Sequence, residues 1–222
     1  MFIEMTREDL NRFLYLLAKE YRKLHKHTEI ILVGGAAIIL GHQFRDTTTD
    51  IDAIIQDRSN IKAIVAKLSD RYELGNDWLN DDFKYTSTYS NALIEHSKFY
   101  RTFCSCIDVR LVQGSYLIAM KLRALREYKH DISDIIGIII ECNTIDITSI
   151  EEAYVTLYND ALNQKELDLL HNIYISDDLD SLYMYVTEKE HENFKHLKQL
   201  QELHPDAVND KNASQYISKI LC

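Results

Sequence analysis

A strand–glycine–helix junction near the N-terminus constrains the fold of this chain more than any other feature. Residues 29–33 read E-I-I-L-V and are followed directly by Gly34 and Gly35. A short apolar run of this kind is typical of a buried strand. Residues 36–40 read A-A-I-I-L and precede Gly41, which predicts a short buried helix that ends at a glycine. The junction therefore favours an α/β arrangement in this part of the chain.

A second predicted strand, residues 50–55, carries two acidic side chains on one face. Asp50 and Asp52 are separated by one residue, so both point to the same side, whereas Ile51, Ala53 and Ile55 point into a core. Adjacent carboxylates repel each other unless a cation lies between them. Mg²⁺ prefers such oxygen ligands and usually also binds substrate phosphates. The alternative is that the acidic pair only marks the end of a strand at an exposed loop.

The glycines also have two interpretations. Gly34 and Gly35 let the backbone approach a phosphate at the N-terminus of the following helix, where free N–H groups and the helix dipole favour anions. Alternatively, they only make a tight turn. The segment is neither a P-loop nor a dinucleotide-binding fingerprint, because it lacks the residues that define those motifs.

Asp108 is the third acidic residue of interest. It lies in a predicted apolar strand at 106–112, C-I-D-V-R-L-V. A buried carboxylate needs a partner, which is either Arg110 or a nearby Lys in a plain ion pair, or a metal shared with Asp50 and Asp52.

The remaining pattern predicts an α+β protein in which a small mixed sheet is flanked by helices and the C-terminal half is all-helical. Thr6 begins a predicted helix that continues to Leu24. Residues 59–72 form another, and the polar, aromatic stretch 77–100 is assigned only to loops or a hairpin. From Gly114 the pattern becomes helical, at 115–128, 131–142, 149–159 and in later stretches to 221 on both sides of Pro205. We place the core at 1–128 and the helical region at 129–222.

Composition narrows the function. The net charge of −10 argues against wrapping nucleic acid through a broad basic surface, although a local basic patch remains compatible with it. The four cysteines do not suggest a disulfide framework. We expect Cys104 and Cys106 to share one strand face as reduced thiols rather than as zinc ligands. No signal peptide or membrane span is expected, so the predicted location is the cytoplasm.

Together these pieces resemble the DNA polymerase β-like nucleotidyltransferase superfamily, and most closely small bacterial nucleotidyltransferase-like proteins, including AbiE-type toxins. The resemblance rests on the Gly-Gly turn, the D-I-D strand, Asp108 and a later helix with Lys121 followed by Asp131 and Asp134. It covers roughly residues 30–56 and 104–136. The last eighty or so residues align with nothing we recognise.

The resemblance implies transfer of a nucleoside monophosphate from an NTP to an acceptor hydroxyl, with two Mg²⁺ (or Mn²⁺) ions. Asp50, Asp52 and Asp108 would be the catalytic and metal-binding residues. Gly34, Gly35, Thr48 and Lys121 would bind the nucleotide. The acceptor would be RNA such as tRNA, a protein or a small molecule, and a toxin of a toxin–antitoxin pair is a natural setting, with an antitoxin protein or a second copy of the chain as partner.

Three supporting residues carry alternatives. In relatives an Arg commonly lies four residues before the first Asp of the pair, but Asp46 holds that place here and Arg45 is one residue early. Asp131 and Asp134 also fit a helix cap and first turn without any functional role. Lys121 is equally compatible with a solvated helix face.

Two other classes compete with an active enzyme. One is a catalytically inactive descendant that binds nucleotide or a partner protein, which the shifted Arg45 favours. The other is a helical interaction protein that dimerises through its second half. The H-E-N-F-K-H segment at 191–196 is not a zinc-protease helix, because its histidines are five residues apart.

Overall fold

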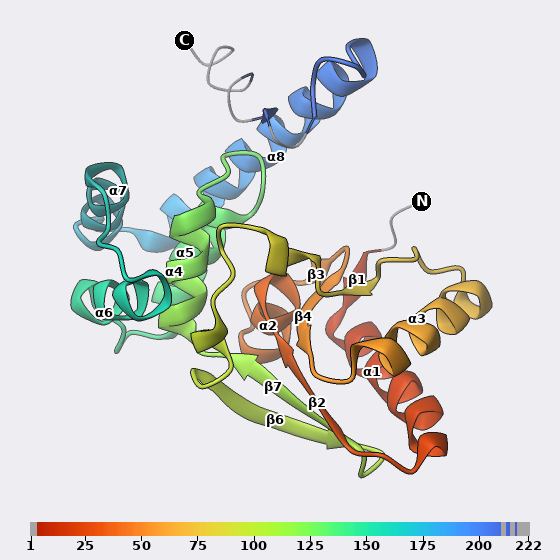
Figure 1. The fold of residues 1–222 in the computed structure, drawn as a ribbon. Coiled ribbons are helices and arrows are strands. Elements are labelled where there is room, and N and C mark those ends of the chain that lie inside the picture. The colour runs from red at the N-terminus through yellow and green to blue at the C-terminus, as the bar shows by residue number, and fades with distance from the viewer. Residues whose placement is uncertain (1–3, 210–211, 214–215, 217–222) are drawn as a thin grey trace.

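The structure, a computed structural model, describes residues 4–209, 212–213 and 216. It is the predicted α+β protein, with a mixed sheet and a helical C-terminal region (Figure 1). The strands are β1 (Met5–Thr6), β2 (Thr28–Leu32), β3 (Thr47–Thr48), β4 (Ile51–Ile55), β5 (Leu79–Asn80), β6 (Ser97–Phe103) and β7 (Ile107–Val112). The α-helices are α1 (Arg7–Tyr21), α2 (Gly34–Gly41), α3 (Arg58–Tyr72), α4 (Gly114–Ala124), α5 (Asp131–Glu141), α6 (Ile147–Tyr158), α7 (Gln164–Tyr174) and α8 (Leu179–Leu203). Short 3₁₀ turns lie at η1 (Arg22–Leu24), η2 (Asp82–Tyr85) and η3 (Asn91–Leu93).

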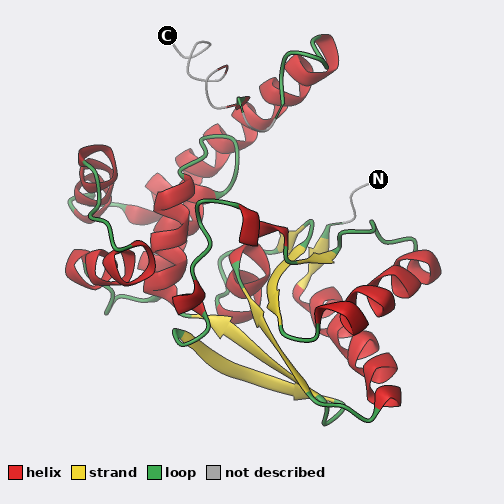
Figure 2. Ribbon diagram, in the orientation of Figure 1, coloured by secondary structure: helices red, strands yellow, loops and turns green. Residues whose placement is uncertain are grey.

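The main sheet has five strands in the order β5-β4-β2-β7-β6. The central strand β2 runs parallel to β7 and antiparallel to β4, and β5 runs parallel to β4. Strands β6 and β7 form an antiparallel hairpin, and β1 pairs with β3 in a separate small sheet. Figure 2 shows the strands gathered in one part of the molecule, with the helices from α4 onward beyond them.

The alternation predicted for residues 50–55 is confirmed by burial. Ile51 and Ala53 are fully buried and Ile55 nearly so, whereas Asp52 between them is half-buried on the opposite face. Thr6 caps α1 as expected, in a reciprocal pair with Asp9. One continuous cluster of buried apolar side chains extends from Met5 to Ile173, so the sheet and the first C-terminal helices share a core.

The C-terminal helices are tied to the sheet region through α5. Helix α5 packs on α4 and on α8. Gly137 in α5 leaves room for the ring of Phe44, which follows α2, and a Cβ there would collide with that ring. In Figure 1, α8 runs past α5 and projects beyond the other helices. None of the helices in the described part of the chain combines the length and apolar character needed to cross a membrane.

The region around the hairpin was predicted only in part. The stretch 77–100, assigned to loops or a hairpin, contains β5 and most of β6, which is the first strand of the hairpin with β7. Cys104 does not lie on a strand beside Cys106, because Cys104 and Ser105 form the hairpin turn, both with positive φ (49° and 57°). Positive φ at both central residues matches the twist of the flanking strands. The periodicity of polar and apolar residues does not report such a turn when it contains no Gly or Asn.

The helices also differ from expectation at their ends. The helix predicted at 115–128 ends at Ala124, because Leu125 adopts a left-handed conformation (φ 38°). Residues 126–130 then form a loop that turns the chain into α5. Beyond Pro205, much of the predicted helical sequence lies outside the described residues.

Candidate functional site

The Gly-Gly turn and the acidic strand face each other across the end of the sheet. Gly34 begins α2 directly after β2 and has a left-handed backbone (φ +57°), which glycine adopts without the strain of a side chain. A Cβ on Gly34 would lie 3.6 Å from a carboxylate oxygen of Asp52. The N-terminus of α2, with its unpaired N–H groups, therefore lies directly beside Asp52.

Arg45 and Thr48 converge on the second glycine. A Cβ on Gly35 would lie 2.6 Å from the Thr48 hydroxyl oxygen and 3.1 Å from an Arg45 guanidinium nitrogen. Only a glycine leaves room for both side chains here. Thr48 also donates to the backbone carbonyl of Asp50 at 3.2 Å. The one-residue shift of Arg45 in sequence thus does not remove it from the glycine turn.

The two carboxylates of the D-x-D strand repel each other. Burial, and then the charge of Asp50, raises the pKa of Asp52 to about 6, although Lys121 and Arg126 act in the opposite direction. Half-buried paired carboxylates of this kind suit Mg²⁺, which binds one or two carboxylates and completes its coordination with water and phosphate oxygens. The chemistry of Asp50 and Asp52 therefore fits a Mg²⁺ ion.

Asp108 does not join them, which corrects the predicted group of three carboxylates. In the ladder between β7 and β2, Asp108 lies opposite Glu29, near the beginning of β2. Asp52 of β4 lies instead beside Val33, just after the end of β2. Since β2 and β7 are parallel, Asp108 lies four residues from the level of Asp52, roughly 13 Å along the strand direction. There it accepts a hydrogen bond from Thr102 at 2.5 Å and lies 3.4 Å from His27. Among the described residues no set of three acidic, His or Cys side chains is arranged to hold a metal.

Asn80 takes the position beside the acidic pair that Asp108 was expected to take. It is directly opposite Asp52 in the ladder between β4 and β5, and its hydrogen bond to Asp52 lowers the pKa of that carboxyl slightly. Sequence analysis missed it, because the short strand β5 lies in a stretch without a readable period.

Lys121 belongs to a buried ionic network rather than to a solvated helix face. Its ammonium group is 3.0 Å from Asp131 and 2.7 Å from Asp134. Arg45 binds the same oxygen of Asp134 at 2.8 Å. Burial opposes the charge of Lys121, but Asp134 and Asp131 outweigh it and raise its pKa. The network thus links α4, α5 and the loop after α2.

Arg126 completes the network and was not predicted as a site residue. It donates from Nε and Nη2 to Asp131 at 2.8 and 3.1 Å, and from its backbone N–H at 3.0 Å. Asp131 is fully buried, which by itself would raise its pKa, but Lys121 and Arg126 hold that pKa well below its usual range. The charges of Lys121 and Arg126 also lower the pKa of Asp52, so the network places positive charge beside the acidic pair.

The N-terminus of α5 is capped from a distant helix. Asp131 was expected to cap it, but its carboxylate is directed to the cations, and the N-cap residue is His130. Instead, Glu190 of α8 accepts hydrogen bonds from the backbone N–H groups of Ile132 and Ser133 at 2.8 and 3.3 Å, and from the Ser133 hydroxyl at 2.5 Å. Burial raises the pKa of Glu190 to about 7 despite these donors. The C-terminal helix therefore supports the segment that carries Asp131 and Asp134.

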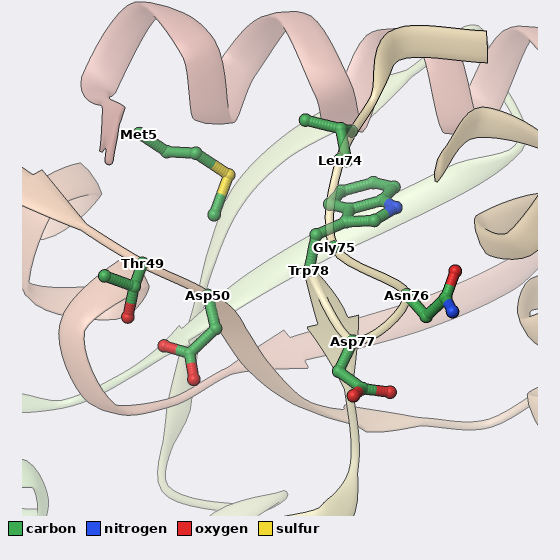
Figure 3. A pocket seen from close by; sticks show the side chains of 8 residues that line it. All are labelled: Met5, Thr49, Asp50, Leu74, Gly75, Asn76, Asp77 and Trp78. Carbon is green, nitrogen blue, oxygen red and sulfur yellow. The ribbon is translucent and has the colours of Figure 1, made fainter. Parts of the chain in front are cut away.

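A pocket of about 120 Å³ opens on the other side of Asp50 (Figure 3). Figure 3 shows Met5, Thr49 and Asp50 facing the segment that contains Leu74, Asp77 and Trp78. The backbone N–H of Ile51 donates to the carbonyl of Trp78 at 2.7 Å, which holds this segment against the beginning of β4.

A glycine turn at a helix N-terminus, facing a D-x-D strand and flanked by buried cations, defines the class: an α+β protein of nucleotidyltransferase type. Comparison with protein families agrees. The model of the family "Nucleotidyltransferase of unknown function (DUF6036)" matches residues 12–181, and the chain belongs to that family. No curated protein and no solved structure matched the chain. The closer resemblance to AbiE-type toxins and the division of the chain at residue 128 stay predictions.

Proposed function

We propose that the protein transfers a nucleoside monophosphate from an NTP to an acceptor hydroxyl. The observation that carries the proposal is the position of Asp52 beside the N-terminus of α2, with Arg45, Lys121 and Arg126 on the same side. This combination offers carboxylates for Mg²⁺ and backbone N–H groups and cations for a triphosphate within one site. Membership of a nucleotidyltransferase family supports it.

In the proposed reaction the acceptor oxygen attacks the α-phosphorus of the NTP. The new P–O bond forms as the bond from the α-phosphorus to the oxygen that bridges to the β-phosphate breaks. Pyrophosphate leaves with that electron pair, and the hydroxyl proton passes to solvent. Mg²⁺ bound by Asp50 and Asp52 would supply neutralising charge at the phosphate oxygens.

The chain's own residues position the nucleotide and neutralise the charge of its phosphates. The N–H groups at Gly34 and Gly35 bind phosphate oxygens, since a helix N-terminus favours anions. Arg45 and Thr48 lie against Gly35 and contact the same end of the nucleotide. Lys121 is already paired with two carboxylates, so we assign it to holding the network and the local positive field rather than to a direct phosphate contact.

One observation favours a second candidate, a nucleotide-binding module without transferase activity. Asp108 is remote from the acidic pair, and a neutral side chain, Asn80, lies opposite Asp52. A site with only two carboxylates binds Mg²⁺–nucleotide but has fewer ligands for a second metal. A role as the toxin of a toxin–antitoxin pair rests on the sequence resemblance alone, and a cytoplasmic location rests on the composition and segment patterns of the sequence alone.

The test is transfer of α-labelled phosphate from each of the four NTPs with Mg²⁺ or Mn²⁺. The acceptors are total RNA, the protein itself and a panel of small alcohols. The control is Asp50→Ala/Asp52→Ala, checked by circular dichroism for an intact fold. We expect label on one acceptor class and none with the control. Thermal stabilisation by NTP without label on any acceptor would replace the transferase by the binding module.

A further inference from the structure

The pocket beside Trp78 is adjacent to the proposed metal site and is acidic, whereas the glycine-turn side of that site is flanked by cations. Asp50 lines the pocket and is also one of the two proposed Mg²⁺ ligands. The pocket therefore opens directly onto the place where the α-phosphate would react. A group seated in it would be held next to the reacting phosphorus.

The charges on the two sides of the acidic pair differ. Arg45, Lys121 and Arg126 lie on the side of Asp52 and the glycine turn. The pocket side carries two carboxylates, Asp50 and Asp77, and no Lys, Arg or His is among the described residues that line it. A triphosphate is attracted to the first side and repelled from the second. The triphosphate is therefore expected outside the pocket, and the acceptor inside it.

The acidic character persists when Mg²⁺ is bound. Asp50 would then share its charge with the metal, but Asp77 is not a proposed ligand and is exposed at the pocket. In Figure 3 the Asp77 carboxylate and that of Asp50 come from opposite walls of the pocket. Asp77 therefore remains to attract a cation.

The size of the pocket limits what enters it. A volume of about 120 Å³ corresponds to about four water molecules. That space accommodates a short amino alcohol or the amine-bearing part of a larger molecule, against walls formed by Met5, Leu74 and Trp78. An RNA end would bring phosphates close to the Asp77 carboxylate, which repels them.

We propose that this pocket binds the acceptor, and that the acceptor is a small alcohol that carries a protonated amine, such as an amino sugar or an amino alcohol. The amine pairs with Asp77 while the hydroxyl is directed toward the α-phosphate. This inference rests on the proposed transferase function for its chemistry, but binding to the pocket is measurable without any transfer.

Trp78 is the only tryptophan of the chain, so intrinsic fluorescence reports directly on the pocket. The protein is titrated with a set of amino sugars and amino alcohols, each paired with its N-acetylated derivative, for example glucosamine and N-acetylglucosamine. The titration is done without nucleotide and then with Mg²⁺ and a non-hydrolysable NTP analogue. We expect a saturable change in Trp78 fluorescence with at least one amine. The affinity for its N-acetylated form should be about three- to fivefold weaker, which is the contribution of an exposed ion pair.

Two variants with the same charge change test the role of Asp77. Asp77→Asn should weaken amine binding by about three- to fivefold and remove most of its salt dependence. Asp70→Asn, on the exposed side of α3 and outside the pocket, should leave both unchanged. Equal binding of amines and N-acetylated forms would overturn the proposed charge selection. So would displacement of the amine by NTP alone, which would make this the nucleotide's pocket.

The outcomes separate this inference from the transferase proposal. Label transferred to RNA or protein, with no effect of amines on Trp78, would keep the transferase and refute the pocket assignment. Amine binding that depends on Asp77, without transfer from any NTP, would keep the pocket and refute the transferase. Label transferred to an amine-bearing alcohol and reduced by Asp77→Asn would support both.

Discussion

Replacing Asp131 with alanine should destabilise the fold far more than removal of an ordinary surface ion pair. The Asp131 carboxylate is fully buried and accepts hydrogen bonds from Lys121 and from the side chain and backbone of Arg126. Lys121 itself is only 9% exposed. Removing the carboxylate takes from buried Lys121 one of its two acidic partners and from the partly exposed Arg126 the acceptor of three hydrogen bonds, and breaking a buried ion pair in this way typically costs about 3–5 kcal/mol.

The corresponding change in melting temperature follows from chain size. For a protein of this length each kcal/mol lowers the melting temperature by about 2–4 °C, so Asp131→Ala should lower it by about 6–20 °C. Asp131→Asn keeps the shape of the side chain and one hydrogen-bond acceptor, so its melting temperature should lie between those of the wild type and of Asp131→Ala. The assay is thermal and urea unfolding followed by circular dichroism.

The matched control is Asp160→Ala. Asp160 pairs with Arg123 at 3.2 Å, a distance similar to those in the network, but the Asp160 side chain is 58% exposed. Exposed pairs of this kind contribute at most about 1 kcal/mol. A loss for Asp131→Ala no larger than for Asp160→Ala would refute the reasoning that burial makes this network costly to break.

Three further predictions test the site and its support. Gly35→Ala should abolish NTP-dependent thermal stabilisation, because its Cβ would collide with Thr48 and Arg45, whereas Gly75→Ala, whose Cβ meets no atom within 4 Å, should retain it; equal behaviour of the two would contradict the crowding at Gly35. Asp108→Asn should keep any transferase activity within about twofold while Asp52→Asn lowers it by at least about a hundredfold, and a comparable loss in both would return Asp108 to the site. The raised pKa of Glu190, about 7 in the folded state, means that its proton is held more tightly there than in the unfolded chain. Its contribution to stability is full below about pH 4.5 and is lost as the pH rises through 7. Urea titrations across this range should therefore show a flatter stability profile for Glu190→Gln than for wild type, by up to about 2–3 kcal/mol, and parallel profiles would refute the assignment.

The local elements of the site were readable from the sequence because short-range chemistry decides them. The apolar run before Gly34 and the alternation around Asp52 each report a period that belongs to one element. Both elements formed as predicted and came together. The position of Arg45 was also settled by a local constraint, since the turn after α2 brings it against Gly35 despite its shift in sequence.

Strand register is where sequence reasoning failed. The apolar residues on both sides of Asp108 correctly predict a strand. They do not indicate which strand pairs with it or in what register. In the sheet, β7 pairs with β2 rather than with β4, and the pairing places Asp108 opposite Glu29. The same uncertainty hid Asn80, whose strand has only two residues and is defined by its partner β4.

The sequence by itself determined the α+β class, the glycine turn and the acidic pair on one face of a strand, because each depends on residues close together in the chain. Only the tertiary structure decided which charges meet. Lys121 and Asp131 lie on different helices, and Glu190 reaches the start of α5 from α8. A buried charge is stable only when the fold supplies its partner, and that partner is chosen by packing between elements, on which local sequence carries no information.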